Sequence, residues 1–140
     1  MKILVDANRI VAALMKQSTT RDILLDEAFE FVTPDYSISE VEEHRDELQQ
    51  RLKLTREEFD VLLALLFERI TVLPKYAYND LINECKEAIE DIDDVPYLAA
   101  CLASKCLGIW SHDPHVLKQK KVSVFTNINM LRMSKSAKSD

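Results

Sequence analysis

Two aspartates lie beyond short apolar runs at opposite ends of the chain. Asp6 follows one near the beginning, and Asp113 follows one near the end. In an open parallel sheet, residues just past the carboxyl ends of the strands gather at one edge, where α/β active sites usually lie. Glu40 and Asp94 stand at predicted helix starts that can reach the same edge. The four carboxylates therefore predict an acidic, metal-binding pocket.

Such a pocket has a defined chemistry. Carboxylates packed together raise one another's pKa values, and a bound divalent cation removes that cost. Hard oxygen ligands favour Mg²⁺ or Mn²⁺ over zinc. A metal held in this way screens an anionic substrate, activates a water molecule and stabilises a leaving oxygen. The ligand set therefore suits hydrolysis of a phosphodiester bond.

Helix capping is the simpler explanation for each acid taken singly. Asp113 precedes a proline, as an N-cap residue often does. Glu40 comes three residues after Ser37, as in a capping box, and Asp94 stands just before a predicted helix. Asp6 has less need of this role, since the asparagine two residues later can cap the same helix. Capping does not, however, require that all four acids converge on one edge.

Composition excludes several classes of function. Gly108 is the only glycine, whereas dinucleotide fingerprints and phosphate-binding P-loops need several. A net charge of −6 argues against a large basic face that binds nucleic acid non-specifically. The three cysteines, Cys85, Cys101 and Cys106, lack metal-ligand spacing and are expected to be free thiols.

Alternating strand and helix patterns predict an α/β fold. We expect three α/β/α layers around a central, mostly parallel sheet of about five strands. Residues 1–133 should form a single domain, and 134–140 a flexible tail. The predicted strands cover residues 2–5, 29–33, 70–73, 109–111 and 122–125, and the predicted helices cover 8–16, 19–28, 38–52, 55–67, 78–89, 96–107 and 114–120.

Local signals place the ends of three of these helices. Ser37 and Glu40 match a capping box, as do Thr55 and Glu58, and the two helices that they open are expected to pair antiparallel. Gly108 is well placed to end the helix before the fourth strand.

Four motifs, in order, resemble those of the PIN-domain ribonucleases, a family that includes the VapC-type toxins of toxin–antitoxin systems. The likeness covers nearly the whole chain. The motifs are Asp6-Ala7-Asn8 after the first strand, Glu40 in its helix, the segment DIDDVPYLAA (residues 91–100) with the acid at Asp94, and the segment IWSHD (residues 109–113) ending in Asp113.

The resemblance implies roles for these residues. Asp6, Glu40, Asp94 and Asp113 would hold one or two Mg²⁺ or Mn²⁺ ions that orient water for attack on an RNA phosphate. Two polar neighbours, Asn8 and Ser111, would fix the carboxylates or a bound water by hydrogen bonds. The simpler alternatives are an N-cap for Asn8 and a satisfied strand-end hydroxyl for Ser111.

Four further residues near the motifs are candidates. Many family members carry an acid two residues after the fourth ligand, where this chain has His115. That imidazole either shifts the metal preference towards Mn²⁺ or is an exposed helix residue. His112 could contact the scissile phosphate when protonated. Asp91 and Asp93 lie close enough to Asp94 in sequence to replace it.

The predicted function is a metal-dependent endoribonuclease, and the toxin of a toxin–antitoxin pair is one form that such an enzyme takes. Its expected partners are RNA, an antitoxin protein and further copies of itself in a homodimer or larger homo-oligomer. No membrane span or signal peptide is evident, so a cytoplasmic location is expected. Two rivals are a non-catalytic PIN-like module in an RNA-processing complex and a phosphotransfer or receiver-like domain that uses Asp6. The second lacks the DxD phosphatase signature.

Overall fold

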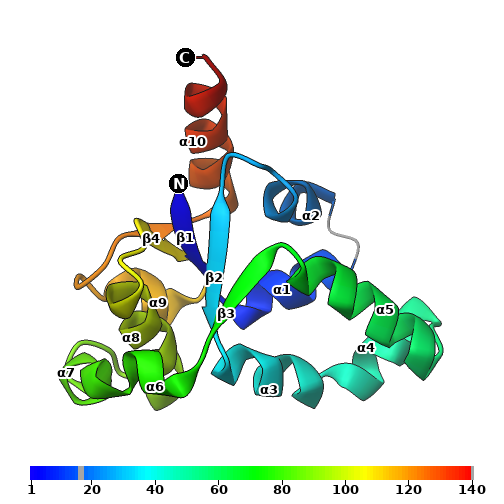
Figure 1. The fold of residues 1–140 in the computed structure, drawn as a ribbon, viewed down its shortest axis with the longest axis horizontal. Helices are drawn as coiled ribbons and strands as arrows, with labels where there is room; N and C mark the ends of the chain where they lie inside the picture. Colours follow the sequence, from blue (N-terminus) through cyan, green and yellow to red (C-terminus); the bar gives the residue numbers. More distant parts are fainter. Residues whose placement is uncertain (16–17, 140) are drawn as a thin grey trace.

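Five parallel strands form a single sheet in the order β3-β2-β1-β4-β5 (Figure 1). The protein is described here by a computed structural model that covers residues 1–15 and 18–139. The sheet confirms the predicted α/β fold. Its strands are β1 (Lys2–Val5), β2 (Glu30–Pro34), β3 (Ile70–Leu73), β4 (Gly108–Trp110) and β5 (Val124–Phe125).

The central strand β1 is apolar because both of its faces are covered. Ile3, Leu4 and Val5 are fully buried, as expected for a parallel strand with helices on either side. The register places Val5 beside Trp110 of β4. The residues that follow these two strands therefore start from neighbouring positions at the carboxyl edge of the sheet.

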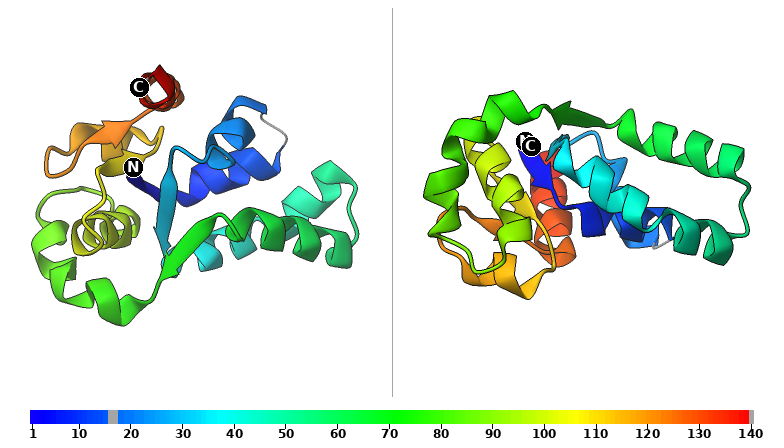
Figure 2. Two further views of the ribbon diagram at one scale, coloured as in Figure 1. Left: turned by 45° about the horizontal axis from the view of Figure 1, so that its top comes forward. Right: turned by 90° about the horizontal axis from the view of Figure 1, so that it is seen from below.

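Helices lie on both sides of the sheet (Figures 1 and 2). Helix α8 packs against β1, β2 and β4, and α1 and α2 pack together on the other side. The α-helices are α1 (Ala7–Leu14), α2 (Ser18–Leu24), α3 (Tyr36–Glu43), α4 (Arg45–Leu52), α5 (Arg56–Phe67), α6 (Lys75–Tyr78), α7 (Ile82–Lys86), α8 (Val95–Ala103), α9 (Pro114–Lys118) and α10 (Asn127–Ser139), with short 3₁₀ turns η1 (Asn79–Leu81) and η2 (Ile92–Asp94). The end of the first predicted helix, at Lys16, lies outside the described residues.

Helices α3, α4 and α5 form an arm that projects from the sheet, with α4 and α5 running in opposite directions (Figure 2). Arg45 holds the arm together: its Nη2 lies 2.7 Å from Asp60 Oδ1, and its guanidinium lies 4.7 Å from the centre of the Phe59 ring. The predicted capping box of α5 is confirmed, since both hydrogen bonds between Thr55 and Glu58 are present.

The other predicted capping box is wrong. Asp35 occupies the N-cap position of α3, and no side-chain cap bond is formed there. Ser37 instead lies buried in the first turn, and the carboxylate of Glu40 accepts a hydrogen bond from Tyr97. The Glu40 side chain therefore binds Tyr97 of α8, and does not cap the start of its own helix as the local pattern predicted.

Gly108 does not end the preceding helix. It is the first residue of β4, and the left-handed residue after α8 is Lys105, with φ of 55°. A Cβ atom on Gly108 would lie 2.6 Å from both Phe125 Cε2 and the Ser123 carbonyl oxygen. The glycine is therefore explained by the close approach of β5.

The chain beyond residue 133 differs from the expected tail. Helix α10 continues to Ser139, and Ser134 is buried and donates a hydrogen bond to Asp26. Lys138 Nζ lies 3.2 Å from the same carboxylate. Both contacts are made to Asp26, which lies just after α2. The small polar composition of residues 134–140 gave no sign of them. No helix within the described residues is long and apolar enough to cross a membrane.

Candidate active site

Asp6 begins the site at the carboxyl end of β1. Its Oδ1 accepts the backbone N–H of Asn8 at 3.1 Å, so Asp6 and not Asn8 caps α1. Its Oδ2 accepts the hydroxyl of Ser111 at 2.6 Å. Burial raises the pKa of Asp6, these two hydrogen bonds lower it, and the charge of Asp113 raises it again. The carboxylate is thus fixed in orientation by the neighbouring strand.

Ser111 connects Asp6 with the fourth predicted acid. The Ser111 hydroxyl, fully buried, also accepts the backbone N–H of Asp113 at 3.1 Å. Asp113 caps α9 as predicted, with Oδ1 accepting the N–H of His115 at 2.8 Å. The hydroxyl therefore positions the Asp6 carboxylate, and its role beside a metal ion stays a prediction.

Glu40 reaches the site from α3 and is held by a tyrosine. The Tyr97 hydroxyl of α8 donates to Glu40 Oε1. Burial raises the pKa of Glu40, the Tyr97 hydrogen bond lowers it, and the charges of Asp6 and Asp93 raise it further. Electrostatic coupling to Asp6 places Glu40 in the same acidic group.

Asp94 is a buried carboxylate whose pKa is strongly raised. It is 7% exposed, and its Oδ2 is buried without a hydrogen-bond partner in the described structure. Burial first, and then the charges of Asp113, Asp91, Asp6 and Glu40, raise its pKa to about 7. A buried acceptor without a donor is costly in a folded protein. The structure therefore brings the four predicted acids together and leaves one oxygen available.

Within residues 1–15 and 18–139, one tight metal-competent group is found, formed by Asp91, Asp94 and His115. Each offers one ligand atom, and these atoms lie within 4.8 Å of one another. His115 Nδ1 also lies 3.5 Å from Asp113 Oδ1. Two carboxylates with one imidazole fit a divalent cation and suit Mn²⁺ better than Mg²⁺. The histidine that replaces an expected acid thus lies at the candidate metal position.

Three other candidates, His112, Asn8 and Asp93, are not members of this metal-competent group. His112 Nε2 accepts the backbone N–H of Asn127 at 3.0 Å, and burial lowers the pKa of the imidazole, so it is neutral and caps the start of α10. Asn8 contributes its backbone N–H, and its side chain is exposed. Asp93 is exposed and accepts the Tyr36 hydroxyl at 2.9 Å.

Three residues next to the acids were not predicted from the sequence. Tyr97 positions Glu40, and Tyr36 binds Asp93. Arg9 has a buried Nε without a partner in the described structure, and its positive charge lowers the pKa of Asp6. Only Tyr97 carried a usable signal, because it lies inside the most distinctive motif, three residues after an acid.

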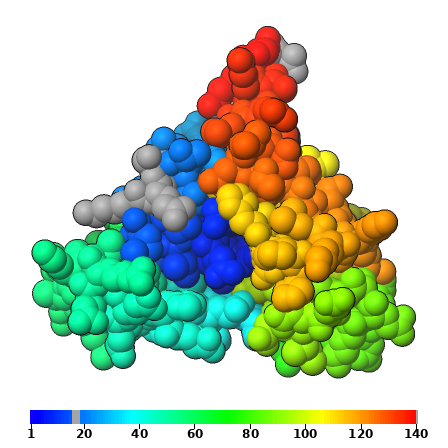
Figure 3. Space-filling model, turned by 180° about the vertical axis from the view of Figure 1, so that it is seen from behind, coloured from blue at the N-terminus to red at the C-terminus, as the bar shows by residue number. Residues whose placement is uncertain are grey.

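Segments distant in sequence meet on one face of the molecule. Figure 3 shows the start of α1 (blue) next to the residues that follow β4 (yellow to orange), with α3 (cyan) below them. The fold and the site together define a class of protein: an α/β protein with an all-parallel sheet and a group of acids at the carboxyl edge of that sheet.

The chain belongs to the PIN domain family, whose sequence profile matches residues 4–130. No curated protein matches the chain. Among solved structures, it is similar to a chain of VapBC2 from Rickettsia felis, which was crystallised bound to a DNA fragment from its promoter. The identity is 12%, the TM-score is 0.63, and the match covers 90% of this chain and 98% of the other. The similarity is one of fold.

Proposed function

We propose that the protein is a metal-dependent endoribonuclease that hydrolyses phosphodiester bonds in RNA. Asp6, Glu40, Asp94 and Asp113 form its acidic centre. The observation that carries this proposal is the buried Oδ2 of Asp94, which has no hydrogen-bond partner among the described residues and lies among electrostatically coupled carboxylates. An arrangement that serves stability alone would have provided a donor for that oxygen.

Asp6, Glu40, Asp94 and Asp113 would hold a Mn²⁺ or Mg²⁺ ion, with Asp91 and His115 as further ligands next to Asp94. When bound, such an ion screens the phosphate charge and activates water. Ser111 keeps Asp6 in one orientation through its hydroxyl. Because Asp94 must lose its proton to act as a ligand, binding of the cation should strengthen as the pH rises through about 7.

Cleavage of an RNA substrate in Mn²⁺ tests the proposal. The variants Asp6→Asn and Asp113→Asn should each lower the rate about 10³-fold or more, because the metal contribution to the barrier is several kcal/mol. Asp46→Asn, on the exposed surface of α4, is the matched control and should cleave like the wild type. Equal cleavage by all four proteins would show that the activity comes from a contaminant.

We further propose that the protein is the toxin of a toxin–antitoxin pair. Its partner would be an antitoxin protein that binds it and inhibits RNA cleavage. Two observations support this. One similar solved structure is of VapBC2. In addition, Val61 and Leu65, one turn apart on α5, are 60% and 54% exposed, which leaves an apolar strip on the arm.

Co-expression with the protein encoded beside this gene tests the partnership. A true antitoxin should copurify with the chain and suppress its RNA cleavage, and the double variant Val61→Gln/Leu65→Gln should weaken copurification. Size-exclusion chromatography of the chain alone tests the predicted homodimer. An unrelated neighbouring gene, or a neighbour that neither binds nor inhibits, would remove the toxin assignment and leave the nuclease proposal intact.

A further inference from the structure

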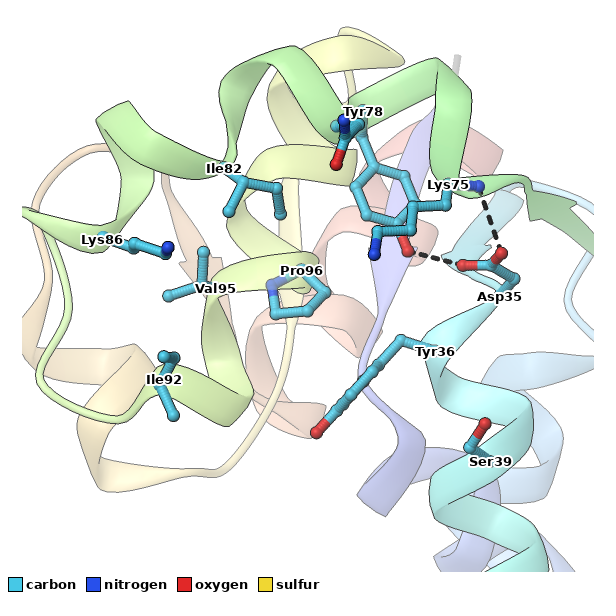
Figure 4. A pocket seen from close by; sticks show the side chains of 11 residues that line it. Asp35, Tyr36, Ser39, Lys75, Tyr78, Ile82, Lys86, Ile92, Val95 and Pro96 are labelled. Atoms are coloured by element: carbon cyan, nitrogen blue, oxygen red, sulfur yellow. Dashed lines mark hydrogen bonds between the residues drawn. The ribbon is translucent and has the colours of Figure 1, made fainter.

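A second concave region lies beside the acidic centre, beyond the carboxyl ends of β2 and β3 (Figure 4). It is a cavity of about 440 Å³, within the roughly 300–1,000 Å³ of typical ligand pockets. Helices α3, α6 and α7 and the start of α8 surround it. Its lining residues include Tyr36, Ser39, Lys75, Asn79, Lys86 and Pro96.

Tyr36 forms a wall between this cavity and the acidic centre. It lines the cavity, and its hydroxyl donates to Asp93 Oδ1 at 2.9 Å. Its ring also packs edge-on against Tyr97, with ring centres 6.1 Å apart, and Tyr97 donates to Glu40. A molecule in the cavity would therefore lie next to the carboxylates of the site.

The charge of the cavity differs from that of the whole protein. Two lysines, Lys75 and Lys86, extend toward it from different sides (Figure 4), against one lining carboxylate, Asp35. Asp35 is already satisfied by the Tyr78 hydroxyl and the Lys75 backbone N–H. Neither lysine side chain forms an ion pair within the described part of the chain. A protein with net charge −6 thus presents, among its described residues, two lysines without an ion pair next to the acidic centre.

We propose that this cavity binds one nucleotide of a single-stranded RNA, next to the phosphate that is cut. The base packs against Tyr36, the Asn79 side chain reads a base edge, and Lys75 and Lys86 contact neighbouring phosphates. Proteins bind unpaired nucleotides in this way, with aromatic faces for bases and cations for phosphates. The inference rests on the proposed nuclease function and assigns its substrate-binding subsite.

Binding of RNA without cleavage tests the lysines. A fluorescein-labelled oligoribonucleotide of mixed sequence is titrated by anisotropy in EDTA, over a series of salt concentrations. Lys75→Gln and Lys86→Gln should each raise the Kd about fivefold to tenfold. Each should also make the slope of log K against log salt shallower by about 0.7, the value for one lost phosphate contact on a single strand. The control is Lys53→Gln, an exposed lysine at the tip of the arm, which should change neither quantity.

Two substitutions of Tyr36 test stacking separately from the hydroxyl contact. Tyr36→Ala should raise the Kd about 5- to 150-fold, and Tyr36→Phe, which keeps the ring, should restore most of the binding. In Mn²⁺-dependent cleavage, the lysine variants should raise KM and leave kcat within about twofold. Thermal melts of every variant identify any that fails to fold. If a Tyr36 variant does not fold, the two lysine variants still test the proposal.

The outcomes separate the two proposals. Wild-type cleavage with unchanged Kd, salt slope and KM in both lysine variants would overturn the nucleotide subsite and leave the nuclease standing. Such a result would point to another occupant, such as a peptide of the partner protein. Absence of any Mn²⁺-dependent cleavage by the wild type would overturn the proposed function, and the subsite with it.

Discussion

Asp35 and Asp94 lie at the same edge of the sheet in opposite circumstances. Asp35, just after β2, has both carboxylate oxygens hydrogen-bonded, to the Tyr78 hydroxyl and the Lys75 backbone N–H. Asp94, just before α8, is buried among other acids with one oxygen unpartnered in the described structure. A carboxylate that is fully paired contributes to the fold, whereas one that is buried and unpaired lowers stability and is retained for binding. Asp35 therefore stabilises the carboxyl edge of the sheet, whereas Asp94 is the residue of that edge that is suited to bind a ligand.

The strongest test of this contrast is the response to Mn²⁺. A cation that binds only the folded protein stabilises it by about 2.7 kcal/mol at a concentration 100 times its Kd. For a chain of this size, the melting temperature should rise by about 6 to 10 °C. Differential scanning fluorimetry with millimolar Mn²⁺ measures the shift, which should persist in Asp35→Asn and disappear in Asp94→Asn. A wild type that shows no shift would favour a non-catalytic PIN module.

Removing each charge in turn should change stability in opposite directions. In EDTA at pH 8, Asp35→Asn should lower the free energy of unfolding by about 1 to 3 kcal/mol, because it weakens hydrogen bonds to a charged acceptor. Asp94→Asn should raise it by about 1 to 3 kcal/mol, because it removes an uncompensated buried charge. Urea unfolding of both variants and the wild type measures the two changes. A loss of stability in both would erase the distinction between the two aspartates.

The stabilisation by Asp94→Asn should also depend on pH. The pKa of Asp94 is raised from 3.8 to about 7 in the folded protein, so the folded state holds a proton that the unfolded chain releases. The wild-type carboxyl therefore loses its contribution to stability as the pH rises from about 4 to about 7. The gap between variant and wild type should be near zero at pH 4 and full at pH 8. A gap independent of pH would mean that the substitution acts through packing.

The smallest expected effect concerns the tyrosine that holds Glu40. Tyr97→Phe keeps the ring and removes the hydroxyl, so the free energy of unfolding should fall by about 0.5 to 1.5 kcal/mol. Cleavage should fall about tenfold, since a positioning contact to a ligand typically contributes 10- to 100-fold. Comparison of kcat with the melting temperature distinguishes positioning from stability. A variant with unchanged kcat would place Glu40 outside the chemistry.

Local sequence signals were reliable where burial alone decides the structure. The bounds of β1 and β3 were predicted correctly, because short apolar or β-branched runs bounded by turn residues leave few alternatives. Convergence of the four acids followed from the geometry of parallel sheets, and did not require any side-chain detail.

Long-range contacts explain the predictions that were wrong. The Ser37 and Glu40 capping box failed because Tyr97, 57 residues further along the chain, binds Glu40. Asp6 both caps a helix and faces the acidic group, although sequence analysis treated these roles as alternatives. The placement of His115 beside Asp91 and Asp94 depends on how α9 sits against η2, and no local pattern encodes that.

The single glycine has a consequence for the site, although it carries no functional group. Any side chain at Gly108 would push against Phe125 and the Ser123 carbonyl. The carbonyl of Phe125 also accepts the N–H of Ser111 at 3.1 Å, and Ser111 in turn orients Asp6. A single methyl group added at Gly108 would therefore displace β5, the outermost strand. That displacement would reach Ser111 through its hydrogen bond to Phe125, and would disturb the orientation of Asp6 beyond the central strand.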